Sequence, residues 1–178
     1  MTMNILHDVP LGSDAPEKFN VIIEIPKGSS NKYEIDKETG LMKLDRVLYS
    51  AMFSPMDYGF APQTHWHDGD PLDVLVMTTY NLLPGVLVEV RPIAVIRMID
   101  SGDRDEKIIA VPTGDPRFNG MKDVSDIEEH ILFELKHYYE HYKDLQKKKV
   151  EVTGIEGVKE AKEVVIEGMK MYKEKFKK

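Results

Sequence analysis

The sequence predicts a single α+β domain in which short strands, closing into a barrel, precede two helices. The chain has 178 residues, of which 42% are hydrophobic and 31% charged, so it can bury one core and keep a polar surface. Apolar runs before residue 112 are short and interrupted by Gly and Pro, whereas later ones repeat at helical spacing. Strands without intervening helices favour a closed barrel over a parallel βαβ sheet. We expect this domain to span residues 1–178.

Strands are expected along the first part of the chain. Residues 19–25 alternate apolar side chains and end at Pro26, whose missing N–H interrupts a ladder. Residues 32–36 follow after a polar turn, and their period of two puts three charged side chains on one face. Turns at 81–85 and 101–106 separate the other β-rich runs, which are 72–78, 86–99 and 107–111.

Two helices are expected in the second part. Ser125 and Glu128 have the spacing of a capping box, so Ser125 should cap a helix that begins there. A short strand should follow at 146–153. Apolar side chains at helical spacing mark the first helix at 127, 131, 132, 135, 138, 139 and 142, and the second at 158, 161, 164, 165, 169, 172 and 176.

Composition excludes several classes of protein. The chain has no Cys, which rules out disulfide scaffolds, thiolate zinc sites, iron–sulfur clusters and cysteine nucleophiles. Its apolar stretches fall far short of the roughly 20 residues of a membrane span, and residues 1–10 lack the features of a secretory signal. Residues 1–142 carry 13 basic and 24 acidic side chains, which argues against a nucleic-acid partner. We expect a cytoplasmic enzyme or binding protein.

Two acidic clusters lie next to apolar runs. Asp68, Asp70 and Asp73 stand within six residues, and carboxylates so close together need a counter-charge. Oxygen ligands without Cys suit magnesium, manganese or calcium, although the spacing does not fit an EF-hand. For this cluster alone, a solvated hairpin is the alternative. Residues 100–107 form a second cluster, and strand ends could bring the two together around more than one cation.

Basic and phenolic side chains occupy comparable positions. Lys32, Arg46 and Lys107 lie on or next to strands, and Tyr142-Lys143 ends the first helix. Each could be an ordinary salt-bridge partner, but acids for metals together with cations for anions favour a metal–phosphate ligand. Neither common glycine-rich nucleotide loop is present in the sequence.

The motif Asp68-Gly-Asp-Pro-Leu-Asp-Val74 resembles the signature of the family I soluble inorganic pyrophosphatases of bacteria and archaea. The resemblance implies a five-stranded OB-like closed β-barrel with two flanking C-terminal helices. It also implies hydrolysis of pyrophosphate to two phosphates by a water activated with several Mg²⁺ ions, or other divalent ions such as Mn²⁺, in a cytoplasmic homohexamer. Further blocks match in family order: Ile23-Glu-Ile-Pro26, Lys32-Tyr-Glu-Ile-Asp36, Asp45-Arg46, Asp57-Tyr-Gly59, Asp100 to Lys107, and His141-Tyr-Lys-Asp144.

The same resemblance implies roles for individual residues. Asp70 matches the carboxylate beside the attacking water. Six acidic residues match metal ligands: Asp68, Asp73 and Asp105 for a tighter pair, Asp100 with Asp105 for a substrate-bridging ion, and Glu24 and Glu34 for the remaining metal, directly or through water. Six other residues match phosphate contacts or lie next to them: Lys32, Arg46, Tyr58, Lys107, Tyr142 and Lys143.

Ser54 departs from the pattern of this family. Some members have a second tyrosine at that position, so one active-site hydrogen bond could be missing here. Tyr49 lies nearby, and alternation does not show whether it replaces the phenol. His137 and His141 have the i, i+4 spacing of a helical zinc pair, but no third acidic ligand is evident. We expect them at a subunit contact or in solvent.

Two rival functions remain open. A barrel that binds single-stranded nucleic acid, or a metal-bound ligand without turnover, would carry basic and aromatic side chains on its face. The predicted face is acidic instead, which disfavours that rival. A general phosphatase acting on phosphate esters is not excluded by the residues alone.

Overall fold

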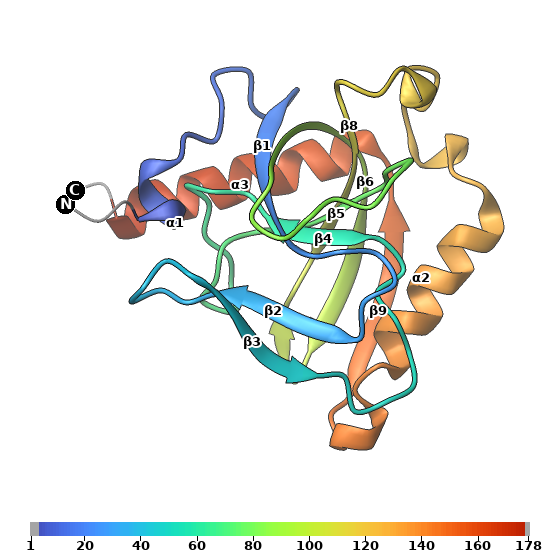
Figure 1. Cartoon of the computed structure of the whole chain (residues 1–178). Coiled ribbons are helices and arrows are strands. Elements are labelled where there is room, and N and C mark those ends of the chain that lie inside the picture. Colours follow the sequence, from blue (N-terminus) through green and yellow to red (C-terminus); the bar gives the residue numbers. More distant parts are fainter. Residues whose placement is uncertain (1–3, 177–178) are drawn as a thin grey trace.

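Five strands pair in a ring (Figure 1). The order is β1-β4-β5-β8-β6, and β6 pairs again with β1 through Val90 opposite Phe19. The β5–β8 pair is parallel and the other pairs are antiparallel. The mixed α+β prediction is confirmed, whereas the closed OB-like barrel stays a prediction. The strands are β1 Phe19–Ile25, β4 Asp57–Phe60, β5 Asp73–Val76, β6 Leu87–Asp100 and β8 Lys107–Pro112.

The remaining elements surround this ring. The computed structural model describes residues 4–176, so residues 1–3 and 177–178 of the predicted domain lie outside the described part. A separate hairpin consists of β2 (Asn31–Ile35) and β3 (Met42–Val47), while β7 (Asp103–Arg104) and β9 (Val150–Glu156) pair with β6. The helices are α1 Ile5–Asp8, α2 Glu129–His141 and α3 Val158–Phe176, with short 3-10 helices η1 Pro116–Phe118, η2 Val124–Asp126 and η3 Asp144–Gln146.

The two long helices cover different faces of β5 and β8. Because side chains alternate along a strand, Val74 and Ile108 belong to one buried cluster, and Leu75 and Ile109 belong to another. The first cluster includes apolar side chains of α3, and the second includes those of α2. Most of the apolar side chains predicted for both helices therefore face the core, whereas Phe176 at the end of α3 is 46% exposed. No helix within residues 4–176 has the length and apolar character needed to cross a bilayer.

Gly59 lets β1 and β4 approach closely. A Cβ atom at this position would lie 2.0 Å from the carbonyl oxygen of Ile22 in β1, so only glycine fits. The neighbouring Tyr58 stands opposite Ile25 in the same ladder. This close pairing carries the Tyr58 side chain to the wall of the cavity described below.

The start of α2 corrects one sequence prediction. Ser125 is not the N-cap, because it lies within η2, and Glu128 caps α2 by accepting a backbone hydrogen bond. Asp123 and Asp126 form a capping box around η2 instead. This aspartate pair satisfies the backbone donors just ahead of Ser125, so the α-helix begins only at Glu129.

The other boundaries follow the sequence with two exceptions. The strand expected at 146–153 begins at Val150, because η3 ends with Lys147 in the left-handed conformation (φ 56°). The strands β3, β4 and β7 are additional to those predicted individually, and β7 lies within the turn expected at 101–106. β4 has only four residues, one of them Gly59, which leaves too little alternation to detect.

Candidate active site

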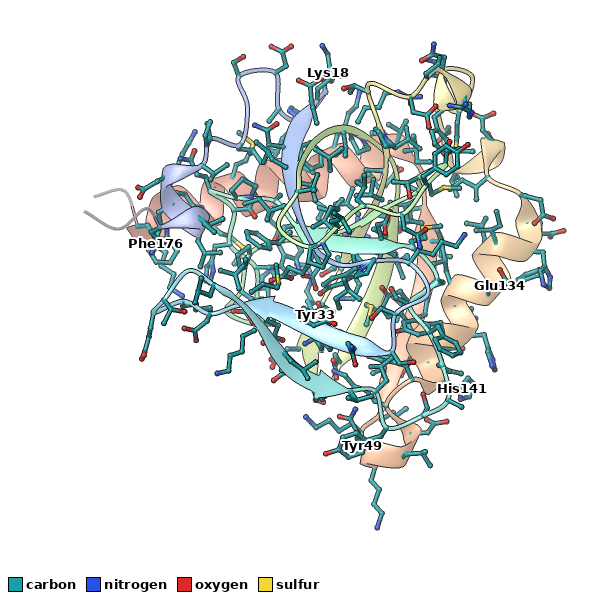
Figure 2. All side chains as sticks on the ribbon, in the orientation of Figure 1. Lys18, Tyr33, Tyr49, Glu134, His141 and Phe176 are labelled. Atoms are coloured by element: carbon teal, nitrogen blue, oxygen red, sulfur yellow. The ribbon has the colours of Figure 1, made fainter. Side chains whose placement is uncertain are left out.

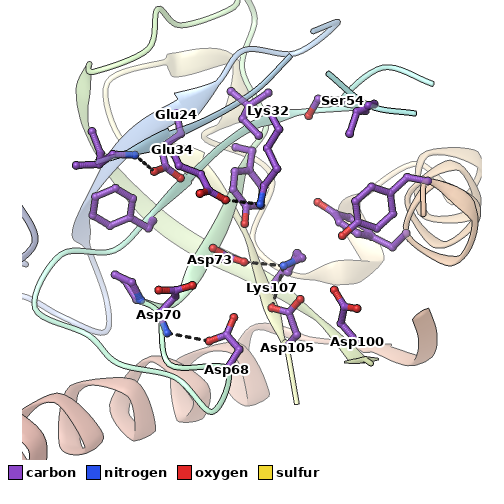
Figure 3. A pocket seen from close by; sticks show the side chains of 18 of the residues that line it. Glu24, Lys32, Glu34, Ser54, Asp68, Asp70, Asp73, Asp100, Asp105 and Lys107 are labelled. Carbon is purple, nitrogen blue, oxygen red and sulfur yellow. Dashed lines mark hydrogen bonds and ion pairs between the residues drawn. The ribbon is translucent and has the colours of Figure 1, made fainter. Parts of the chain in front are cut away.

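One cavity of about 250 Å³ gathers nearly all the candidate residues (Figure 3). It lies between the ring, the β2–β3 hairpin and the end of α2. Arg46 is the single candidate outside its lining. The candidates that line it are Glu24, Lys32, Glu34, Tyr58, Asp68, Asp70, Asp73, Asp100, Asp105, Lys107, Tyr142 and Lys143.

The parallel pairing of β5 and β8 brings the two acidic clusters together. Both strands begin at the same edge of the ring, and Asp73 stands directly opposite Lys107 in the ladder. The loop before β5 carries Asp68 and Asp70, and Asp105 precedes β8 by two residues. Residues more than 30 positions apart therefore meet at one sheet edge, as the sequence predicts for strand ends.

Lys107 is the counter-charge of this edge. Its Nζ lies 2.6 Å from Asp73 Oδ2 and 3.0 Å from Asp105 Oδ1, and the residue is only 2% exposed. Burial lowers the pKa of a lysine, but the two carboxylates outweigh burial and raise the pKa of Lys107 well above its usual value. The amine therefore stays protonated.

The carboxylates around Lys107 are crowded. Burial, supported by the charge of Asp73, raises the pKa of Asp105 to about 6 although Lys107 opposes the shift. Burial and Asp73 also raise the pKa of Asp68. One lysine is thus too little positive charge for this set of acids, and added cations would stabilise their ionised forms.

Glu24 faces the cavity from β1. Its Oε1 accepts a hydrogen bond from the backbone N of Ile35 (2.8 Å), which ties β1 to the hairpin. Burial raises the pKa of Glu24 to about 8, and the nearby Asp73 and Glu34 act in the same direction. The folded chain therefore holds a proton on Glu24 between pH 4.5 and about 8, where an unfolded chain has lost it.

We predict that Glu24→Gln stabilises the metal-free chain at pH 8. Because Glu24 must take up a proton when the chain folds in this range, the free energy of unfolding falls as pH rises from about 4.5 towards 8. The amide removes this penalty and still accepts the hydrogen bond from the backbone N–H of Ile35. Urea unfolding with a chelator should show a gain that is largest at pH 8 and vanishes near pH 4.5. A gain equal at both pH values would contradict the buried-acid explanation.

The β2–β3 hairpin supplies the cations of the opposite wall. Lys32 Nζ lies 2.5 Å from Glu34 Oε1, and the register places Arg46 of β3 opposite Lys32. Arg46 pairs with its neighbour Asp45, and its buried Nε has no hydrogen-bond partner among residues 4–176. Its charge also acts on the phenol of Tyr138, which lines the cavity. Arg46 is thus close to the cavity without forming its wall.

The end of α2 supplies the third wall. Lys143 Nζ donates to Asp100 Oδ2 in a short ion pair. Burial raises the pKa of Asp100, but Lys143 outweighs that effect, so the pKa lies below its usual value. Tyr142 is buried next to Lys143, whose Nζ lies 5.2 Å from the centre of the phenol ring. The Asp100–Lys143 ion pair thus joins the second acidic cluster to the segment that follows α2.

Lys37, Tyr138 and Tyr139 line the cavity although they are outside the predicted set. Lys37, in the turn of the hairpin, places its Nζ 2.5 Å from Asp70 Oδ1. Tyr138 and Tyr139 line the cavity from α2, and Lys107 Nζ lies 5.6 Å from the centre of the Tyr139 ring. Helical spacing marks both tyrosines as apolar-face residues, so a sequence interpretation treats them as core.

Ser54 also lines the cavity and donates to the carbonyl of Met56 (2.8 Å). Tyr49 does not replace the phenol that some relatives have there, because it is 62% exposed and outside the lining (Figure 2). His141 pairs with Asp144 (2.9 Å), and neither it nor His137 lines the cavity.

The donor set fits hard divalent cations. All its candidate ligands are carboxylates, and Mg²⁺ prefers oxygen. Within residues 4–176, no three His, Asp or Glu side chains already converge on one point. Lys107 accounts for this in part, because its amine separates Asp73 from Asp105. Cations would compete with Lys107 for these two carboxylates and free its amine for an anion.

Comparisons with known proteins point to one family. The family model described as inorganic pyrophosphatase matches residues 21–173. The inorganic pyrophosphatase of Picrophilus torridus is 43% identical over 171 residues, which cover 96% of this chain and 97% of that protein. That of Geobacillus stearothermophilus is 49% identical over 152 residues, or 85% of this chain and 92% of that protein.

A solved structure supports the same family. The crystal structure of inorganic pyrophosphatase from Thermus thermophilus superposes with a TM-score of 0.92 at 45% identity. The match covers 96% of this chain and 99% of the other. This chain therefore belongs to the inorganic pyrophosphatase family and is an enzyme of the hydrolase class.

Proposed function

We propose that this chain hydrolyses pyrophosphate to two phosphates with several Mg²⁺ ions in the cavity of Figure 3. One observation carries the proposal: six candidate carboxylate ligands and four lysines from distant segments line one small cavity. Acids suited to divalent cations and amines suited to phosphate oxygens together match a metal–diphosphate complex. The OB-like barrel is the scaffold we infer for them.

The acids divide between two regions of the cavity. Asp68, Asp73 and Asp105 cluster at the β5–β8 edge and would hold the tighter pair of ions, while Asp100 with Asp105 would hold a further one. Glu24 and Glu34, from β1 and β2, would hold the remaining ion directly or through water. When bound, the Mg²⁺ ions would offset the charge of pyrophosphate and lower the pKa of a water. Mn²⁺ or another hard divalent ion could take their place.

Asp70 would act on the attacking water. Its carboxylate is free of the Lys107 network and lies at the cavity wall beside Asp68. The water oxygen forms a bond to one phosphorus, the bond from that phosphorus to the bridging oxygen breaks, and Asp70 accepts the water proton. Lys37 would help to hold the Asp70 side chain in place, since the two side chains pair at 2.5 Å.

Cations and phenols would hold the two phosphoryl groups. Lys32 and Lys143 approach from opposite walls, and Lys107 becomes available once cations occupy its carboxylates. Arg46 would reach the substrate from the neighbouring strand. These charges stabilise the negative charge that builds up on the leaving phosphate. Tyr58 and Tyr142 would add phenolic hydrogen bonds.

The first test is substrate selectivity. Phosphate release from pyrophosphate with Mg²⁺ should be fast, and release from a phosphate monoester should be slow, because the cavity is built for two adjacent phosphoryl groups. Equal rates on both substrates would favour the general phosphatase instead. Binding of pyrophosphate without phosphate release would favour a binding module.

We also predict that the chain forms a homohexamer in the cytoplasm. The segment from β3 to Phe53 exposes Leu44, Val47, Tyr49 and Phe53 by half or more of their surface. Apolar side chains gathered in one exposed segment are typical of a subunit contact. Light scattering should give a mass near six times the 20.4 kDa of the chain. A stable monomer at micromolar concentration would contradict this.

A further inference from the structure

Trp66, the one tryptophan of the sequence, lies two residues before the aspartate loop and is 1% exposed. Its indole Nε1–H donates to Glu106 Oε2 at 2.8 Å. Its backbone closes the loop as well, because Trp66 N donates to the carbonyl of Asp70 (2.8 Å) and Gly69 N donates to the carbonyl of Trp66 (3.1 Å). The turn that presents Asp68 and Asp70 is therefore built directly on Trp66.

Glu106 is buried between two residues of the site. It is 4% exposed and stands between Asp105 and Lys107, which line the cavity, although Glu106 itself does not. Its Oε1 accepts from Arg104 Nε (2.8 Å) and lies 3.6 Å from Arg97. A buried carboxylate needs such partners. Besides the indole N–H, Glu106 thus has two ionic partners, Arg104 and Arg97.

The Trp66–Glu106 hydrogen bond joins the segments that carry the two acidic clusters, and neither of its residues lines the cavity. Trp66 belongs to the loop of Asp68 and Asp70, whereas Glu106 belongs to the segment of Asp105. Helix α3 supports the pair, because Glu167 accepts from Arg104 (3.3 Å) and the guanidinium lies 5.2 Å from the centre of the Trp66 ring. These contacts lie outside the cavity lining, so no substrate or ion would touch them.

We propose that the Trp66–Glu106 hydrogen bond is a positioning contact that sets the spacing between the aspartate loop and the Asp105 segment, and thereby the affinity for divalent cations. The inference rests on the proposed function for the identity of the ion. Carboxylates held at the spacing of a bound ion lose little freedom when the ion arrives. Without this hydrogen bond, binding of the ion must also order the aspartate loop, and this cost lowers the affinity for the ion. Partners behind the ligands typically change metal affinity by about 10–100-fold.

The test is Mg²⁺ titration by calorimetry on folded full-length variants. Glu106→Ala, which removes every contact of the carboxylate, should weaken Mg²⁺ binding by about 10–100-fold, and Trp66→Phe, which removes the indole N–H, by about tenfold. Glu106→Gln keeps an acceptor for the indole and should restore part of the affinity. Glu156→Gln is the matched control, because it removes the partner of Arg97 (2.7 Å) without touching either cluster, and it should bind Mg²⁺ like the unaltered chain.

A split in the kinetics separates positioning from general damage. At saturating Mg²⁺, the kcat of Glu106→Ala and Trp66→Phe should recover to within about threefold of the unaltered chain, because no group that touches substrate has changed. A Mg²⁺ affinity within twofold of the unaltered chain in Trp66→Phe would overturn the inference, even if Glu106→Ala does not fold. An equal loss in Glu156→Gln would overturn it too. If the unaltered chain binds Mg²⁺ but leaves pyrophosphate intact, the proposed function fails, while the calorimetric comparison still decides the role of Trp66.

Discussion

Asp70→Asn is expected to lower the kcat for pyrophosphate by about 10²–10⁴-fold, the usual contribution of a positioned general base. The amide preserves the shape of Asp70 and its place at the cavity wall, but it cannot accept the water proton. Raising the pH should restore part of the rate, because the attacking water then loses its proton to solvent. Mg²⁺ binding should change little. The measurement is a pH–rate profile beside calorimetric Mg²⁺ titration.

Asp68→Asn, in the same loop, and Asp73→Asn, at the first residue of β5, are the matched comparisons. Each replaces a proposed metal ligand, so Mg²⁺ affinity should fall, and excess Mg²⁺ should recover part of the activity. If Asp70→Asn is rescued by Mg²⁺ and indifferent to pH in the same way, Asp70 is another ligand rather than the base.

Lys107→Met should be the most damaging change at the β5–β8 edge. Without Mg²⁺ it leaves Asp73 and Asp105 without their buried partner, a loss that typically costs about 3–5 kcal/mol of unfolding free energy. Mg²⁺ should stabilise the variant more than the unaltered chain, since the ions supply the missing charge. Turnover should still fall by about ten- to a hundredfold at saturating Mg²⁺, through loss of a phosphate contact.

Lys162→Met provides the control for this lysine. It breaks the ion pair with Glu17 (2.5 Å), neither residue of which lines the cavity, and a pair between partly exposed side chains contributes about 0–1 kcal/mol. Thermal unfolding with and without Mg²⁺ measures both variants. An Mg²⁺-induced rise in Tm no larger for Lys107→Met than for Lys162→Met would show that cations do not replace the charge of Lys107.

The strands of the ring with long apolar runs could be predicted from sequence. Residues 19–25 and 87–100 alternate or continue far enough to identify a strand. β4 could not, because its partners β1 and β5 impose the extended conformation on four residues that include Gly59. The predicted N-cap of α2 is wrong because Ser125 lies within η2, which Asp123 and Asp126 cap, and Glu128 caps α2 instead.

The site could be predicted where motifs carry the ligands. The loop Asp68–Asp73 and the segment Asp100–Lys107 are visible in the sequence, and the parallel register of β5 and β8 explains why they meet. Lys37 and Tyr139 escaped prediction for different reasons. Lys37 reaches Asp70 only because the hairpin folds over the cavity, and Tyr139 has the spacing of a core residue. Contacts between different secondary-structure elements cannot be predicted from the spacing of residues within one segment.

The most direct test of the whole account is the rate of phosphate release from pyrophosphate as a function of free Mg²⁺. If several ions must occupy the cavity, the rate should be negligible in excess chelator and should rise more steeply than a single-site curve before it saturates. Calorimetry on the same preparation should show more than one Mg²⁺ bound per chain over that range. A rate that persists in excess chelator, or that saturates when one Mg²⁺ is bound, would contradict hydrolysis by several metal ions in this cavity.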